Sequence, residues 1–230
     1  MPNPLSKVRP KCNYEHSPDS LRSRPGHASL IMQVIANVSL IENTRGLIFS
    51  YLLGVDDYLA LLIYSEIRSA SVKSSAFHAV IKASLSEEDR EMLNKIDKFS
   101  KKVIAQRNKF SHGLWGTSND LPDAILYLPS DHFLDKTHQY LDNPHARGLE
   151  RKILAPGLQD RSRVMVYTVG DLENSVSESI SALSLYRNFF DLVFHMHHVR
   201  NEDAAGLLKE VFAQREAEIR EQLRSDLQKQ

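Results

Sequence analysis

The sequence predicts an all-α protein: an antiparallel helical bundle with a small β-hairpin-like insertion and a charged helix at its C-terminus. Apolar residues recur at helical spacing over long stretches of the chain. Glycines and helix-capping residues stand at the ends of these stretches, and the connections between them are short, as in a bundle. The two runs that are typical of strands both fall between residues 114 and 167.

The first two helices are expected on either side of Gly54. The first begins near His27 and carries an apolar stripe at steps of three and four residues. Gly54 is expected to end it, because glycine is the usual residue after a helix C-terminus. Asp56 or Asp57 can cap the second helix, which is expected to continue to about Arg68.

Two further helices are expected at residues 71–85 and from Ser86 to Gly113. Ser86 can accept a hydrogen bond from a backbone amide, and the acidic residues after it favour the positive end of the helix dipole. Gly113 is expected to end this fourth helix in the left-handed conformation. Its apolar stripe consists of Met92, Ile96, Phe99, Val103 and Phe110.

An insertion at about residues 114–167 separates these four helices from the next expected helix. It is rich in turn-forming residues, and its β-like runs at 124–128 and 164–167 are expected to pair as a hairpin around a long excursion. Such long irregular segments are usually functional or mobile. Thr168 and the residues after it begin another helix, of about six turns.

The chain therefore divides into three expected regions. Residues 1–26 contain five prolines and no periodicity, which predicts a flexible N-terminal arm. Residues 27–199 form the helical domain with its insertion. Residues 200–230 are rich in charge and lose their apolar positions after Phe212, so we expect a helix that projects from the body or packs on a partner.

The composition excludes several classes of protein. The 230 residues include 29 Lys and Arg against 29 Asp and Glu, which argues against a polycationic protein that binds nucleic acids along their length. The single cysteine, Cys12, excludes a disulfide scaffold or a cysteine-based zinc cluster. The most apolar window, 47–64, is interrupted by a glycine and two aspartates. We therefore expect no membrane segment and a cytoplasmic protein.

The segment from Arg107 to Trp115 is the strongest candidate site. Arg107 falls on the apolar stripe of its helix, where a charge is costly without a partner. Glu42 interrupts the stripe of the first helix in the same way. A contact between Glu42 and Arg107 across the bundle would explain both anomalies, and a local pair of Glu42 with Arg45 is the simpler alternative.

This segment resembles the Arg-(four to six residues)-His motif of the HEPN superfamily. The matching residues are Arg107-Asn108 at its start and Ser111-His112-Gly113-Leu114-Trp115 at its end, and the resemblance covers about residues 28–195. It implies metal-independent RNA cleavage, without a cofactor, at a site formed across a homodimer.

The resemblance assigns a role to each residue of the motif. His112 would act as general base or general acid, and Arg107 would stabilise the charge that develops on the phosphate. Asn108 and Ser111 would orient the phosphate or His112, with Glu42 in support. Exposed lysines on the same helix would contact the RNA; they are Lys98, Lys101, Lys102 and Lys109.

These features favour an endoribonuclease of a defence, toxin or stress system. It would act by itself or be inhibited by an antitoxin. The main alternative is a catalytically inactive HEPN-like module that binds RNA or assembles with a partner protein. In that case Arg107 is paired in the core, His112 caps its helix and Trp115 anchors the following loop. A metal bound by Asp191, His195 and His198 is a weaker interpretation, because histidines at a helix C-terminus also favour the dipole.

Overall fold

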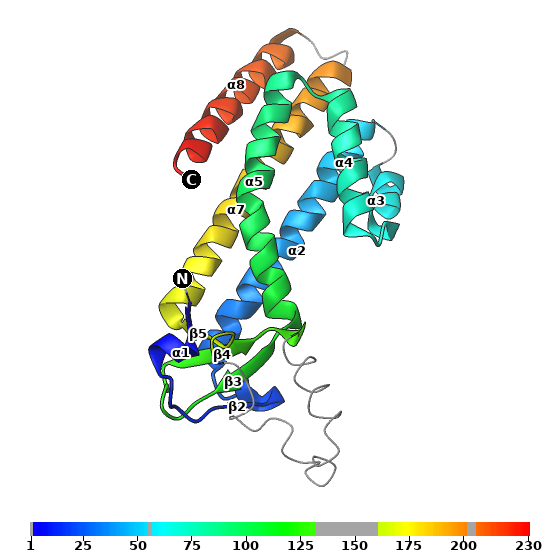
Figure 1. The fold of residues 1–230 in the computed structure, drawn as a ribbon. Coiled ribbons are helices and arrows are strands. Elements are labelled where there is room, and N and C mark those ends of the chain that lie inside the picture. Colours follow the sequence, from blue (N-terminus) through cyan, green and yellow to red (C-terminus); the bar gives the residue numbers. More distant parts are fainter. Residues whose placement is uncertain (1, 55–56, 132–160, 202–205) are drawn as a thin grey trace. The chain divides into compact units, whose positions relative to one another are not determined.

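The computed structural model describes residues 2–54, 57–131, 161–201 and 206–230 (Figure 1). This part of the chain is mostly helical and carries a small antiparallel sheet. It forms two compact units, which we describe separately. The sheet unit comprises Met1–Ile35 and Ala105–Glu178, and the helical unit comprises Ala36–Ile104 and Ser179–Gln230.

The helices lie where the apolar periodicity predicts them. They are α2 (Pro25–Leu53), α3 (Asp57–Glu66), α4 (Ala70–Ser84), α5 (Glu87–His112), α7 (Val169–Asn201) and α8 (Gly206–Gln228). Gly54 follows α2 with a φ of 63°, so it ends that helix as expected. The hydroxyl of Ser86 accepts a hydrogen bond from the backbone amide of Asp89 at 3.2 Å, which confirms the predicted cap of α5.

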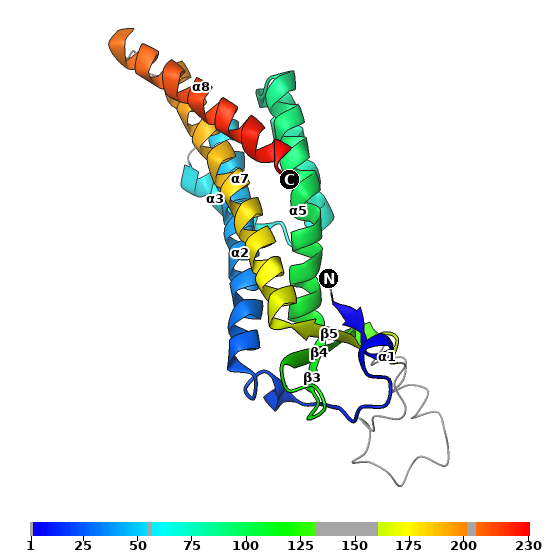
Figure 2. The same ribbon diagram turned by 90° about the vertical axis from the view of Figure 1, so that its left-hand side faces the viewer.

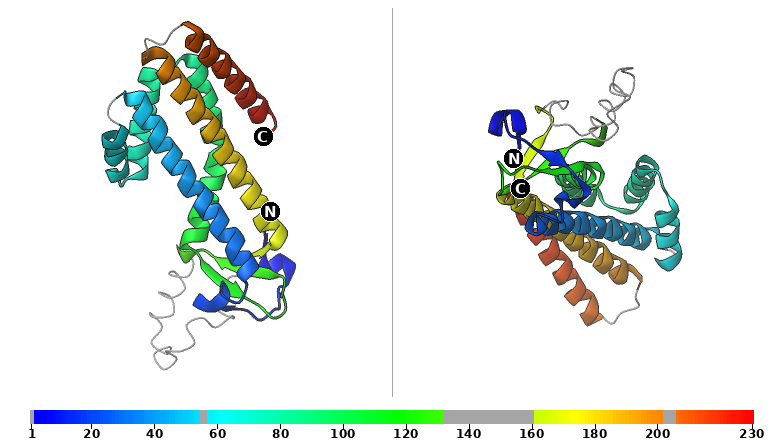
Figure 3. Two further views of the ribbon diagram at one scale, coloured as in Figure 1. Left: turned by 180° about the vertical axis from the view of Figure 1, so that it is seen from behind. Right: turned by 90° about the horizontal axis from the view of Figure 1, so that it is seen from below.

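The helical unit has one large apolar core. Its largest fully buried side chains come from four helices and include Ile41 and Ile48 of α2, Phe77 of α4, Leu93 and Ile96 of α5, and Tyr186 and Phe189 of α7. Figure 3 shows α2 and α7 from behind. Burial of these side chains is the main stabilising contribution to this unit.

Helix α8 packs against this core, which corrects the expectation of a projecting helix. The chain returns from α7 into α8 (Figures 1 and 2) and buries Ile219 and Leu223. Arg220 between them forms an ion pair with Asp89, whose side chain is fully buried at the start of α5. The sequence did not reveal this because the apolar positions of α8 are few and stand among charged residues.

The sheet has the order β1-β5-β4-β3-β2, and all its strand pairs are antiparallel. Its strands are β1 (Asn3–Pro4), β2 (Glu15–His16), β3 (Leu114–Thr117), β4 (Ala124–Leu128) and β5 (Met165–Thr168). Two short helical segments, α1 (Leu5–Val8) and η1 (Pro18–Ser20), accompany the N-terminal strands. The expected pairing of the runs at 124–128 and 164–167 is confirmed, with Ala124 opposite Thr168. Residues 132–160 of the predicted insertion lie outside the described residues.

The N-terminal segment is part of the sheet unit, so the prediction of a flexible arm is wrong for the described residues 2–26. It supplies both edge strands, β1 and β2 (Figure 3), and buries Leu5, Cys12 and Tyr14 against β4 and β5. Prolines are tolerated at such edges, because an edge strand needs to donate on one side only. Pairing with residues 100 or more positions away leaves no local periodicity to detect.

No helix among the described residues is long and apolar enough to cross a membrane.

Substitution of Arg220 tests the packing of α8. Arg220→Ala would leave the buried carboxylate of Asp89 without its cationic partner, which typically costs about 3 kcal/mol or more of unfolding free energy. The matched control is Arg215→Ala on the same helix, because Arg215 pairs with Glu218 at an exposed site. Urea unfolding followed by circular dichroism would measure both variants. Equal stability of the two would contradict the role assigned to Arg220.

Candidate functional site

The residues of the candidate motif lie on the last turns of α5, within the sheet unit. The side chains of Asn108, Lys109, Ser111 and His112 are exposed, and that of Arg107 is half-buried. Acidic residues open α5, and Lys109 and His112 occupy its last turn, where cationic groups favour the helix dipole. His112 is thus accessible to a ligand, and it stands at the end of a well-defined helix.

Arg107 and His112 lie on different faces of α5. The helix continues through His112, so five residues separate them by a rotation of about 140°. Arg107 belongs to the stripe that contains the buried side chains of Val103 and Phe110. The two side chains of one chain therefore leave the helix in different directions.

His112 shares its face of α5 with the candidate lysines. By helical rotation these residues fall within a sector of about 100°. All five side chains are exposed; they are Lys98, Lys101, Lys102, Lys109 and His112. We call this set the lysine face. Lys109 and His112 belong to the sheet unit, and the other three lysines belong to the helical unit. Exposed lysines favour a polyanionic ligand in either unit.

The guanidinium of Arg107 has one local partner and one unsatisfied donor. Its Nη1 donates to Oδ1 of Asn108 at 3.1 Å. Its buried Nε has no hydrogen-bond partner among the described residues. An unsatisfied buried donor is unfavourable, and a phosphate oxygen is the kind of acceptor that a guanidinium binds best.

Glu42 lies in the helical unit, where its carboxylate is 3.9 Å from the guanidinium of Arg45. This is the local pair that the sequence offered as the simpler alternative. Arg107 belongs to the other unit, so a contact between Glu42 and Arg107 stays a prediction.

An aromatic cluster holds the residues that follow α5. The ring of Trp115 lies 5.5 Å from that of Phe110 and 5.4 Å from that of Tyr127, between centroids. Tyr167 completes the cluster and accepts a hydrogen bond at 2.9 Å from the side chain of Gln106, one turn before Phe110. The predicted anchoring role of Trp115 agrees with this packing.

Burial keeps the tyrosines of this cluster uncharged. It raises the pKa of Tyr127 to about 12 and raises the pKa of Tyr167, although the hydrogen bond from Gln106 opposes the latter shift. The cluster therefore positions the segment but supplies no proton-transfer group near neutral pH.

Gly113 is required for close packing and not for a left-handed turn. Among the described glycines only Gly54 has a positive φ, so the expectation of a left-handed cap at Gly113 is wrong. A Cβ atom on Gly113 would lie 1.8 Å from Cε2 of Tyr127. The ring of Tyr127 occupies the space that a side chain at position 113 would need, which explains why this residue is a glycine.

The structure also brings together a group that sequence reasoning missed. Tyr186 of α7 donates a hydrogen bond to Asp97 of α5, and His78 of α4 lies 3.4 Å from the same carboxylate. These residues are far apart in the chain, and each is ordinary in its own sequence context. The charge of Asp97 directly after the buried Ile96 was the one available signal.

The structure does not test the metal interpretation of Asp191, His195 and His198, because the side chain of His198 lies outside the described residues. No group of three or more suitable side chains is found among the described residues. The side chains of His197 and His198 lie outside them.

No protein-family model, curated protein or solved structure matches this chain. The class that the structure defines is therefore a mostly helical protein with a small antiparallel sheet. Membership of the HEPN superfamily stays a prediction from the motif at residues 107–115.

Substitution of Gly113 tests the packing of the candidate segment. Gly113→Ala should lower the unfolding free energy by about 3 kcal/mol, because the new methyl group overlaps the ring of Tyr127. Gly170→Ala is the control, since a Cβ there meets no atom closer than 3.9 Å. Denaturant unfolding monitored by the fluorescence of Trp115, the single tryptophan, reports on this cluster directly. A Gly113→Ala protein as stable as the control would contradict the packing described.

Proposed function

We propose that this protein is a HEPN-like, metal-independent endoribonuclease with an antiparallel bundle fold. The observation that carries the proposal is the combination, on the last turns of α5, of the exposed imidazole of His112 with the half-buried guanidinium of Arg107. The resemblance of residues 107–115 to the HEPN motif supports the same conclusion.

The chemistry requires acid–base catalysis and charge stabilisation. His112 takes the proton of a ribose 2′-hydroxyl, or gives a proton to the leaving 5′-oxygen. The 2′-oxygen attacks phosphorus as the bond to the 5′-oxygen breaks, which leaves a 2′,3′-cyclic phosphate. Arg107 donates to the phosphate oxygens as their charge grows. Asn108, which already contacts Arg107, orients the guanidinium, and Ser111 orients His112 or the phosphate.

The divergence of the two side chains supports a homodimer in this proposal. In a two-fold symmetric dimer, Arg107 of one protomer can meet His112 of the other, and the reciprocal pair forms a second site. The lysine face then guides the RNA backbone, and its contribution falls as salt is raised. We place such an enzyme in a cytoplasmic defence, toxin or stress system, with an antitoxin or another protein as a regulatory partner.

A second candidate function is an RNA-binding module without catalysis. The exposed lysine face favours it, because phosphate contacts from lysines require neither Arg107 nor a dimer. Cleavage distinguishes the two candidates, since both predict binding.

An RNA cleavage assay in the presence of EDTA tests the proposal. The wild-type protein should cleave single-stranded RNA, while His112→Ala and Arg107→Ala should each reduce the rate by about a hundredfold or more. Arg187→Ala, which removes an exposed arginine of α7, should keep the wild-type rate.

Cleavage that survives both substitutions, or that requires a metal, would refute the proposed mechanism. RNA binding without cleavage by the wild-type protein would favour the second candidate.

A further inference from the structure

Helix α3 is apolar on every side, although it lies on the outside of the helical unit (Figures 1 and 3). Residues 58–64 read Tyr-Leu-Ala-Leu-Leu-Ile-Tyr, which is a run of seven apolar residues without a charge. A helix that is apolar all round is normally covered on all sides, because each exposed apolar side chain costs free energy in water. A helix at the outside of its unit has one side that the unit itself does not cover.

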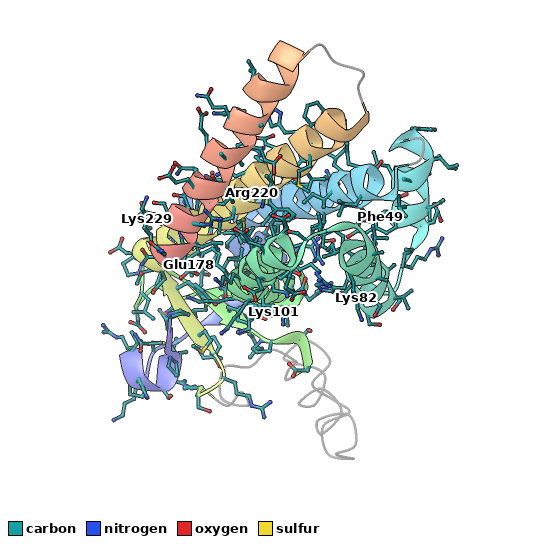
Figure 4. The ribbon with its side chains drawn as sticks, turned by 90° about the horizontal axis from the view of Figure 1, so that it is seen from above. Phe49, Lys82, Lys101, Glu178, Arg220 and Lys229 are labelled. Carbon is teal, nitrogen blue, oxygen red and sulfur yellow. The ribbon has the colours of Figure 1, made fainter. Side chains whose placement is uncertain are left out.

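The inner face of α3 packs firmly on α2 and α4. Ala60 and Tyr64 are buried there. The ring centroid of Tyr64 lies 5.1 Å from that of Phe49 on α2 and 6.5 Å from that of Phe77 on α4. Figure 4 labels Phe49, on the side of the view where α3 lies. Gly46 of α2 allows this close approach, since a Cβ atom there would lie 3.2 Å from Cδ1 of Tyr64. The orientation of α3 within the helical unit is therefore fixed by packing.

The opposite face of α3 leaves four large apolar side chains exposed. Their exposed fractions are 71% for Tyr58, 53% for Leu59, 43% for Leu62 and 51% for Ile63. By helical rotation these residues fall within a sector of about 140°. We call this set the outer face of α3. Among the described residues, no other helix exposes as many large apolar side chains over so short a length.

The area of the outer face is sufficient for a dimer interface. The four side chains together expose about 400 Å², which is within the range of functional apolar patches. Two such faces in contact would bury about 800 Å² of apolar surface. Homodimer interfaces are about 65% apolar, so the complete interface would bury about 1,200 Å². Specific, stable interfaces begin at about this size.

The character of the outer face favours a second copy of this chain as its partner. No charged residue interrupts positions 58–65, so the face has no charge pattern by which a different partner protein would be selected. An apolar face is complementary to itself, and a two-fold axis lets two copies bury the same residues against each other. Interfaces of homodimers are also the more apolar class.

We propose that the outer face of α3 is the interface of a homodimer, in which α3 of one protomer packs on α3 of its partner. Tyr58, Leu59, Leu62 and Ile63 of each protomer become buried in this contact. The proposal depends on α3 and not on the chemistry of Arg107 and His112, although the proposed ribonuclease also requires two copies.

Light scattering and sedimentation equilibrium of the full-length protein test this interface. The wild-type protein should be dimeric at micromolar concentration. Leu62→Glu and Ile63→Glu each place a charge within the buried face and should raise the Kd of the dimer by about a hundredfold or more. Val211→Glu is the matched control, because it replaces an apolar side chain of α8 that is 57% exposed, and it should keep the wild-type Kd.

Circular dichroism separates loss of the dimer from loss of the fold. Both glutamate variants should keep the helical spectrum of the wild-type protein, because the substituted side chains are exposed in the single chain. Tyr58→Ser is a milder variant that introduces no charge, and it should raise the Kd of the dimer by about tenfold.

A monomeric wild-type protein would overturn the proposal, and so would a Leu62→Glu protein that is dimeric with the wild-type Kd. Wild-type monomers that bind phosphatidylcholine vesicles through α3 would also overturn it, since the face would then be covered by lipid. RNA cleavage does not enter this test. Loss of the dimer in Leu62→Glu would support the interface even if the wild-type protein cleaved no RNA.

Discussion

The packing of the Tyr127 ring over Gly113 is the contact on which the candidate site depends. The ring fills the space where any other residue would place a Cβ atom, and Trp115 and Phe110 close around it. The chain must therefore leave α5 directly after His112 and enter β3. As a result, the imidazole is exposed at the helix end while the aromatic side chains on both sides of it are buried.

Local sequence signals were enough to predict the long helices, because each of them carries its own apolar period and its own end signals. Gly54 and Ser86 are examples in which the residue type alone indicates the boundary. The strands β1 and β2 could not be predicted in this way, since their partners lie elsewhere in the chain. The packing of helix α8 could not be predicted for a related reason. Its burial depends on a few apolar residues and on the ion pair of Arg220 with Asp89.

The candidate site likewise combines features that local sequence signals predict with features that depend on contacts between distant parts of the chain. The place of Arg107 on an apolar stripe follows from helical periodicity, and the structure agrees, whereas the exposure of His112 is known only from the structure. The sequence could not explain the glycine at position 113, because the explanation is a contact with Tyr127 of β4, a strand that follows later in the chain. The lysines of α5 were also identified from the sequence, although the acidic residues that open this helix help to keep the overall charge neutral.

A mixing experiment tests most directly whether Arg107 and His112 act together across two copies. If each site takes Arg107 from one protomer and His112 from the other, a heterodimer of Arg107→Ala and His112→Ala chains contains one intact site and one with both defects. After subunit exchange, the mixture of two inactive variants should recover about a quarter of the wild-type cleavage rate, given random pairing. A mixture as inactive as either variant alone, with subunit exchange demonstrated, would contradict the shared site.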